Sequence, residues 1–202
     1  MPLFFAVMAC HVSFAQADSL SKVDSFLRLR TKVYPFPDVI AAVLRDFPFN
    51  LRHLTGELIM AEGEIENYAS IVQLSEADRC LITCYHSRYD TTVSWQARMP
   101  VTDAFEKADR LYRDLYRKLQ QCTFTMSDGN IIYLQGVWEP AREDAAFTTS
   151  TLRLTTGDWR YREVKVELEL VYLMAEWGVN INIVTKKRDD EVGGGGVSDV
   201  MQ

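Results

Sequence analysis

The feature that most constrains the fold is a strict alternation of apolar and charged side chains over residues 162–170. The apolar set is Val164, Val166, Leu168 and Leu170, and the charged set is Glu163, Lys165, Glu167 and Glu169. Successive side chains of a β-strand point to opposite faces, so this pattern predicts a strand with one buried and one charged face. Such strands are typical of antiparallel sheets that are covered on one face only.

Other segments add strands and helices to this one. The run 92–99 alternates in the same way, and we expect further strands over 54–61, 64–74, 80–85, 130–138, 147–154 and 179–183. Apolar residues at three- and four-residue steps predict one helix between Pro37 and Pro48 and a second over 103–122. We therefore expect an α+β fold, an antiparallel sheet of about seven to eight strands with two main helices on one face.

The expected organisation is a single domain over residues 35–185. Residues 18–34 form a polar lead-in, and residues 186–202, with four consecutive glycines at 193–196, lack any apolar pattern. We expect this tail to be disordered. The hydrophobic content of 48% and the charged content of 25% are those of a globular protein.

The first seventeen residues predict export. They contain no charged side chain, are mostly apolar between Leu3 and Phe14, and end on Ala15-Gln16-Ala17. Small residues at the first and third positions before a cut suit signal peptidase, and the run is shorter than the ~20 apolar residues that span a bilayer. We expect a signal peptide over 1–17, cleavage after Ala17, a periplasmic or extracellular protein, and no transmembrane segment.

A lipid anchor is the alternative within the same segment. The sequence Val7-Met8-Ala9-Cys10 loosely resembles a lipobox, in which the cysteine becomes the acylated N-terminus. The apolar run continues after Cys10 from Val12 to Ala17, where a lipoprotein normally turns polar. We therefore favour the unanchored form.

Three features of the layout occur together: the Ser-Phe-Ala-Gln ending of the signal, the spacing of Phe47, Asn50, Leu54 and Gly56, and the closing Val-x-Val-x-Leu and Val-x-Ile-x-Ile strands. In these features the chain resembles exported proteins of unknown function from Bacteroidetes-type bacteria. The resemblance covers most of the mature chain and implies no activity.

Charge argues against nucleic acid as a partner. The formal net charge is −6, and no basic cluster offsets it. DNA or RNA would therefore meet net repulsion.

Three cysteines remain after the expected cleavage: Cys80, Cys84 and Cys122. Cys122 ends the apolar stripe of the 103–122 helix, while Cys80 and Cys84 share a strand face. If that face lies under the helix, the sequence predicts a disulfide between Cys122 and Cys84 or Cys80. The alternative is three buried, reduced thiols that act as small hydrophobic side chains.

Few residues suggest catalysis, a metal or a cofactor. His53 and His86 belong to no zinc-binding pattern, and no Gly-rich phosphate or dinucleotide loop occurs. His86 lies near Ser87 and Asp90, but three residues of one turn rarely converge as a triad. We expect no catalytic residue, metal site or cofactor from these patterns.

The densest acidic cluster consists of Glu57, Glu62, Glu64 and Glu66. Paired carboxylates can hydrolyse glycosides or bind Ca²⁺, and Glu64 and Glu66 are expected to share one strand face. An exposed, charged hairpin tip that discourages edge pairing is the simpler interpretation.

Two aromatic residues are the best candidates for a binding surface. When the alternation of 162–170 is extended backwards, Trp159 and Tyr161 fall on the charged, outward face. Exposed aromatic side chains often anchor partners. We therefore expect a non-catalytic exported domain that binds a protein or a small ligand in the cell envelope. A hydrolase that uses acidic residues near 57–66 and a structural envelope subunit are the alternatives.

Overall fold

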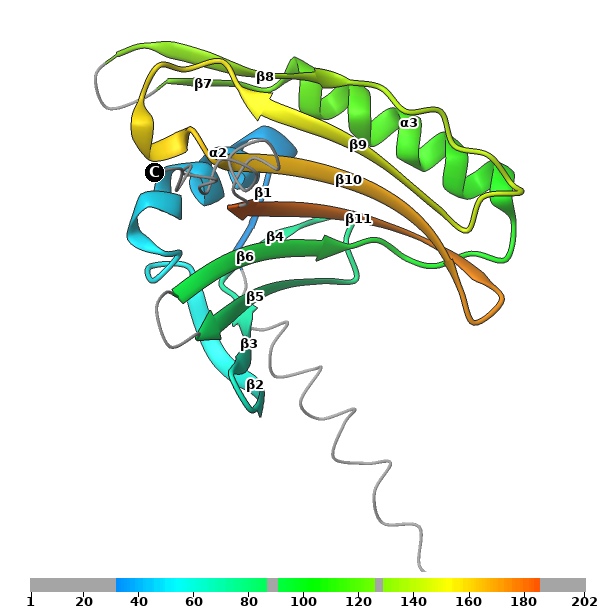
Figure 1. Ribbon diagram of the computed structural model, residues 1–202, viewed down its shortest axis with the longest axis horizontal. Coiled ribbons are helices and arrows are strands. Elements are labelled where there is room, and N and C mark those ends of the chain that lie inside the picture. Colours follow the sequence, from blue (N-terminus) through cyan, green and yellow to red (C-terminus); the bar gives the residue numbers. More distant parts are fainter. Residues whose placement is uncertain (1–31, 87–90, 126–128, 186–202) are drawn as a thin grey trace, which may run out of the picture. The chain divides into compact units, whose positions relative to one another are not determined.

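The computed structural model describes residues 32–86, 91–125 and 129–185. Within them, nine strands form one antiparallel sheet, two short strands form a parallel pair, and two α-helices pack with them (Figure 1). The expected α+β fold with an antiparallel sheet is confirmed, with slightly more strands than the seven to eight expected. The predicted signal peptide with Cys10, the lead-in up to residue 31 and the tail 186–202 lie outside the described residues.

The main sheet has a simple order in which most neighbours are joined by hairpins. From one edge to the other, its strands are β2 (Thr55–Glu62), β3 (Ile65–Ser70), β5 (Arg79–His86), β6 (Thr91–Arg98), β11 (Glu176–Thr185), β10 (Val164–Leu173), β9 (Phe147–Leu154), β8 (Ile131–Val137) and β7 (Thr123–Thr125). β10 is central, and its even-numbered residues from Val164 to Leu170 are buried, as the alternation predicts. That burial fixes which face of the sheet holds the core.

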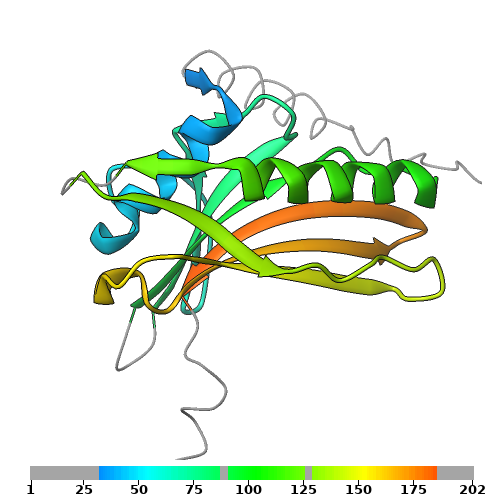
Figure 2. The ribbon, with the colours of Figure 1, turned by 90° about the horizontal axis from the view of Figure 1, so that it is seen from above.

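Both helices lie on the core face (Figure 2). α3 (Phe105–Gln121) packs mainly against β8, β10 and β11, and α2 (Phe36–Asp46) packs against α3 and β4. The buried side chains of α3 include Ala108, Tyr112, Leu115 and Leu119, which recur at three- and four-residue steps. Neither helix has the length and apolar character that crossing a membrane requires.

A parallel strand pair lies beside this sheet. β1 (Lys32–Tyr34) pairs with β4 (Val72–Leu74), and β1 belongs to the segment expected to be a polar lead-in. Regular structure therefore begins three residues before the predicted domain boundary at 35. Three residues are too few to show an alternation, which is why the sequence pattern does not predict β1. β4 lies within the segment 64–74 expected as one strand, which the structure divides into β3 and β4.

Two buried serines connect the sheet to its aromatic core. The indole Nε1 of Trp95 donates a hydrogen bond to Ser70 Oγ at 3.1 Å. The hydroxyls of Tyr112 and Ser150 lie 2.7 Å apart, and Glu139 N donates to the same Ser150 oxygen at 2.9 Å. These bonds satisfy polar groups that would otherwise destabilise a dry core.

Candidate functional site

The face of the sheet that points away from the two helices is the main candidate surface, and we call it the open face. Among the described residues, no helix lies on it (Figure 2). Its side chains form rows across the strands in register. One row is Asn67, Thr83, Ser94, Val184, Lys165, Arg153 and Gln135; the next is Leu81, Gln96, Asn182, Glu167, Thr151 and Val137.

Hydrogen bonds between side chains order the neutral part of the open face. Gln96 Nε2 donates to Asn182 Oδ1 at 2.8 Å, and Thr83 Oγ1 donates to Asn67 Oδ1 at 2.7 Å. Both bonds join neighbouring strands. The polar groups are therefore held in fixed positions, and such preorganisation lowers the entropic cost of binding wherever a surface binds a ligand.

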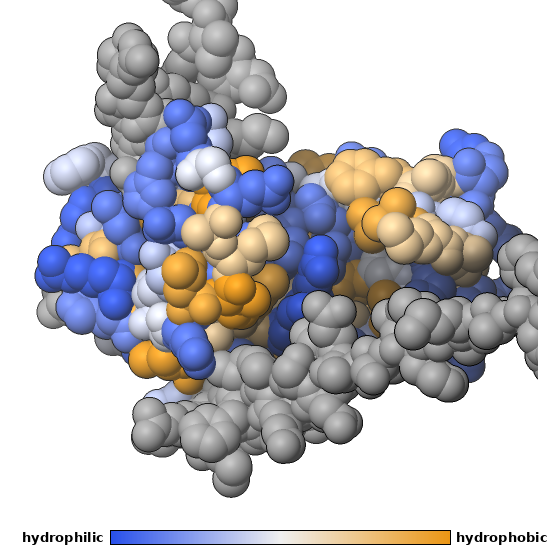
Figure 3. All heavy atoms as spheres, turned by 90° about the horizontal axis from the view of Figure 1, so that it is seen from below, coloured by the Kyte–Doolittle hydropathy of each residue, from blue (hydrophilic) through white to orange (hydrophobic). Residues whose placement is uncertain are grey.

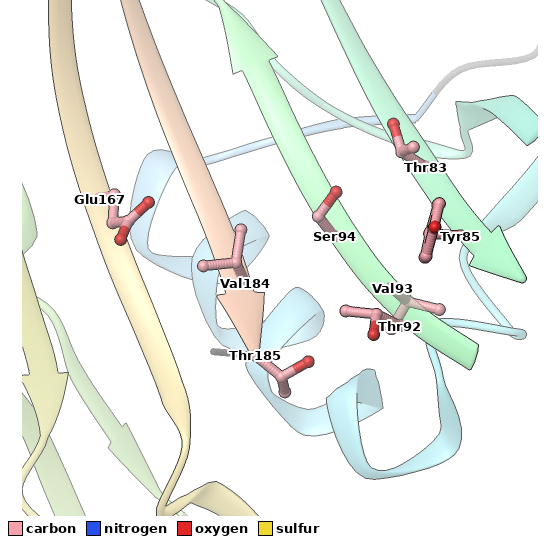
Figure 4. A pocket seen from close by; sticks show the side chains of 8 residues that line it. All are labelled: Thr83, Tyr85, Thr92, Val93, Ser94, Glu167, Val184 and Thr185. Atoms are coloured by element: carbon pink, nitrogen blue, oxygen red, sulfur yellow. The ribbon is translucent and has the colours of Figure 1, made fainter. Parts of the chain in front are cut away.

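The first of two hollows in this face spans β5, β6, β11 and β10 (Figure 4). Its volume is about 290 Å³, and its lining includes Thr83, Tyr85, Thr92, Ser94, Glu167 and Val184. α2 lies behind the strands in this view, on the opposite side of the sheet from the hollow. Most polar groups of this lining are hydroxyls, and its charged group is the carboxylate of Glu167.

The second hollow lies between β8, β9 and β10 and has a volume of about 410 Å³. Its polar lining comprises Gln135, Glu139, Thr149, Thr151, Arg153 and Lys165. Lys165 is only 8% exposed to solvent, although it lies on the open face. Sequence alternation places Lys165 on the outward face, but nothing in the sequence places Arg153 or Thr149 beside it.

Trp159 and Tyr161, the predicted binding residues, have different environments. They belong to the 3₁₀ helix η2 (Trp159–Tyr161), so the strand alternation does not extend to them. Trp159 is 81% exposed, whereas Tyr161 is 4% exposed and belongs to the core. The predicted outward position is thus wrong for Tyr161, because a helical turn separates neighbouring side chains differently from a strand. Binding by Trp159 stays a prediction.

The acidic cluster does not form a pair of facing carboxylates. β3 begins at Ile65, so Glu64 belongs to the turn that Gly63 makes with a φ of 59°. Glu64 is hydrogen-bonded by Tyr85, which lines the first hollow, whereas Glu66 faces the helix side, opposite Cys84. The expectation that Glu64 and Glu66 share a strand face is therefore wrong. Glu57 and Glu62 are exposed residues of the edge strand β2.

Glu66 has its own polar cluster with Tyr68 and His86. Its Oε2 accepts a hydrogen bond from Tyr68 OH at 2.6 Å and lies 3.0 Å from His86 Nε2. The hydrogen bond from Tyr68, followed by that from His86, lowers the pKa of Glu66 below its usual range. A carboxyl group that loses its proton so readily is a poor general acid at neutral pH.

His53 and His86, the histidines of the described residues, each contact a carboxylate. His53 donates its backbone N–H to Asp46 Oδ2 at 3.0 Å, and its Nδ1 lies 2.5 Å from Asp46 Oδ1. Ser87 and Asp90, the other members of the turn considered as a triad, lie outside the described residues. Within those residues, no three histidine, cysteine, aspartate or glutamate side chains come together as a metal site.

The three predicted disulfide candidates are free thiols. α3 packs mainly against β8, β10 and β11, whereas Cys80 and Cys84 lie on β5. Cys122 Sγ instead donates to Lys118 O at 3.1 Å, and Cys80 Sγ accepts from Leu74 N at 3.5 Å. The structure therefore contains no disulfide from Cys122 to Cys80 or Cys84.

Burial keeps two of these thiols protonated. It raises the pKa of Cys80 to about 12 and that of Cys122 to about 11. Burial also raises the pKa of Cys84, with a further contribution from the charge of Glu66. None of the three is therefore an activated thiolate nucleophile.

Comparison with protein-family models, with curated proteins and with solved structures finds no match to this chain.

Proposed function

We propose that this protein is a non-catalytic, exported binding module whose open face takes a small ligand. The supporting observation is the open face itself, with its rows of ordered hydrogen-bonding side chains and its two hollows. Small-molecule sites are concave surfaces with a few precisely placed polar groups. A protein partner is the alternative occupant, and the exposed Trp159 is its best candidate anchor.

The small-molecule fraction of an envelope extract, added to isotope-labelled protein, tests this proposal. We expect the backbone amide NMR signals of open-face residues such as Ser94 and Thr151 to shift. A Thr151→Trp variant should lose the shifts around the second hollow, because the indole fills it. Lys107→Trp, on the exposed side of α3, is the matched control and should keep them. Shifts confined to the surroundings of Trp159, or none at all, would contradict the proposal.

Export is part of the proposal and rests on Ala15-Gln16-Ala17 at the end of the uncharged apolar run. Intact mass of the protein recovered from its native host should correspond to a chain that begins at Asp18. An acylated Cys10 as the first residue, or retention of residues 1–17, would count against it.

A hydrolase is the second candidate, on the cluster of Glu66, Tyr68 and His86. The lowered pKa of Glu66 limits this carboxylate to the role of base or nucleophile, so the acid must come from elsewhere. Turnover in a broad hydrolase screen that disappears in Glu66→Gln would favour the enzyme over the binding module.

A further inference from the structure

Two cations face each other directly on the open face. Lys165 of β10 is in register with Arg153 of β9, and both side chains line the second hollow. Like charges in directly opposed positions of an antiparallel pair destabilise the sheet. The other neighbours in this row are Val184, beside Lys165, and Gln135, beside Arg153, so the row supplies no carboxylate.

Neither cation is paired with a carboxylate within the described part of the chain. Neither side chain forms an ion pair or a hydrogen bond there. The nearby acidic side chains are Glu163 and Glu167 in the same segment as Lys165, and Glu139 at the edge of the hollow. A lysine residue that is 8% exposed and has no ion-pair partner is costly, so its position needs an explanation.

A third unsatisfied group lies in the same hollow. Thr149 Oγ1 is buried and has no hydrogen-bond partner among the described residues. The lining therefore combines an ammonium, a guanidinium, this threonine hydroxyl, the Thr151 hydroxyl and the Gln135 amide. All five can donate hydrogen bonds, and the two that are buried, Lys165 and the Thr149 hydroxyl, have no partner among the described residues. Buried donors without partners are rare in native proteins.

We propose that the second hollow binds a small organic anion through a carboxylate or phosphate group. The anion lies between Lys165 and Arg153 and supplies the missing counter-charge. The planar guanidinium of Arg153 binds two oxygens at once, Lys165 supplies the second positive charge, and Thr149 donates its free hydroxyl. The inference rests on the proposed binding function of the open face and names the ligand class that it takes.

Titration with inorganic phosphate and, separately, succinate tests the anion site on the full chain. Amide signals of Thr149, Thr151 and Arg153 should shift, and succinamide, the uncharged analogue, should leave them in place. Lys165→Met and Arg153→Gln should each weaken binding by about tenfold or more, since each removes a charge-assisted hydrogen bond. Arg110→Gln on the outer side of α3 removes one positive charge elsewhere and should bind as the wild type does.

The thermal stability of the ligand-free protein gives a second test, which does not depend on measuring binding. Lys165→Met replaces the ammonium by an apolar side chain of similar length, so the melting temperature should rise. A fall would show that the ammonium has a structural role, and would overturn the inference. Binding that weakens equally in Arg110→Gln would indicate general attraction by net charge, and would also overturn it.

Removing anions from the envelope extract separates this inference from the proposed function. After anion exchange, the shifts around the second hollow should disappear. If they persist, the open face binds a neutral ligand, so the proposed function stands and the anion site is wrong. If the untreated extract causes no shift and neither phosphate nor succinate binds, both are wrong.

Discussion

Trp159 and Tyr161 lie on one turn of helix, yet we expect only the side chain of Tyr161 to contribute strongly to the stability of the fold. Tyr161 is in the core, so Tyr161→Ala should lower the free energy of unfolding by about 3–5 kcal/mol. Trp159→Ala should change it by less than about 0.5 kcal/mol, because an exposed side chain loses little packing. Urea unfolding of both variants measures the difference. A large loss for Trp159→Ala would remove this residue as a candidate anchor for a partner.

The buried thiol of Cys80 should make the free energy of unfolding depend on pH in the alkaline range. Burial raises its pKa from 9.0 to about 12, so between these values the unfolded thiol ionises while the folded thiol stays neutral. The unfolded state then binds fewer protons, and the free energy of unfolding falls as pH rises through this range. Well below pH 9.0 the thiol is protonated in both states, so the titration of Cys80 does not change the free energy of unfolding.

Buried tyrosines with raised pKa values, such as Tyr112 and Tyr161, act in the same direction. The contribution of Cys80 is therefore the difference between the wild type and Cys80→Ala. The variant should be less stable at neutral pH and should lose less stability on going to alkaline pH. Equal slopes for the two proteins would show that the thiol does not titrate in this way.

At the scale of the elements, the β10–β11 hairpin has a costly turn. Met174 and Ala175 form a two-residue loop with φ values of 53° and 65°. Both lie in the left-handed region, where Asn and Gly are preferred and other residues are strained. Met174→Asn with Ala175→Gly should raise the free energy of unfolding by about 1 kcal/mol, since Met174 is 89% exposed and packs little. Thermal unfolding that is unchanged or earlier would contradict this prediction.

Gly136 is required where β8 meets β9. A Cβ atom at this position would lie 2.7 Å from Leu152 Cα and would also collide with Thr151 O. Gly136→Ala should therefore lower the free energy of unfolding by about 1–3 kcal/mol and disturb the second hollow. Gly157→Ala is the matched control, because nothing lies within 4 Å of its added Cβ. Urea unfolding should rank Gly136→Ala as clearly less stable than Gly157→Ala.

Periodicity accounts for the elements that could be predicted from the sequence. β6 and β10 alternate cleanly, and α3 repeats its apolar residues at helical steps. β1 and β7 have three residues each and show no period, and the strand expected over 64–74 is divided into β3 and β4. The turn at Glu64 and η2 at Trp159 interrupt alternations that a strand would have continued. Local patterns thus predict long elements and miss the places where they stop.

The candidate site was harder to predict because it depends on register. Alternation shows that Lys165 points outward, but only strand pairing puts Arg153 opposite it and Thr149 in the same hollow. A one-residue slip of β9 would turn the side chain of Arg153 to the other face. The register of the strands is set by contacts across the whole sheet, so it cannot be predicted from the pattern of any single segment.

For the molecule as a whole, the two edges of the sheet differ. One edge is β7, which is only three residues long and therefore offers little backbone for further pairing. The other is the eight-residue β2, whose pairing with β3 is irregular at two places. Irregular pairing and the charges of Glu57 and Glu62 discourage addition of another strand. Three consecutive residues of β2, Leu58, Ile59 and Met60, are nevertheless exposed and apolar.

These residues make β2 the expected site of weak self-association. In Figure 3, hydrophobic side chains gather in two separate places, which match the exposed apolar residues of β2–β3 and those of the β10–β11 hairpin. The first combines apolar side chains with a long sheet edge, whereas the hairpin tip exposes apolar side chains without one. Edge strands of this kind template pairing between chains.

We predict that the protein dimerises increasingly with concentration and that Ile59→Lys reduces this association, because a lysine on an edge strand disfavours pairing. Sedimentation velocity over a range of concentrations measures the dimer fraction. Leu173→Lys is the matched control, since it places the same charge on the second apolar patch, away from any sheet edge. If Leu173→Lys abolishes association and Ile59→Lys does not, the chains meet through the hairpin tip rather than through β2.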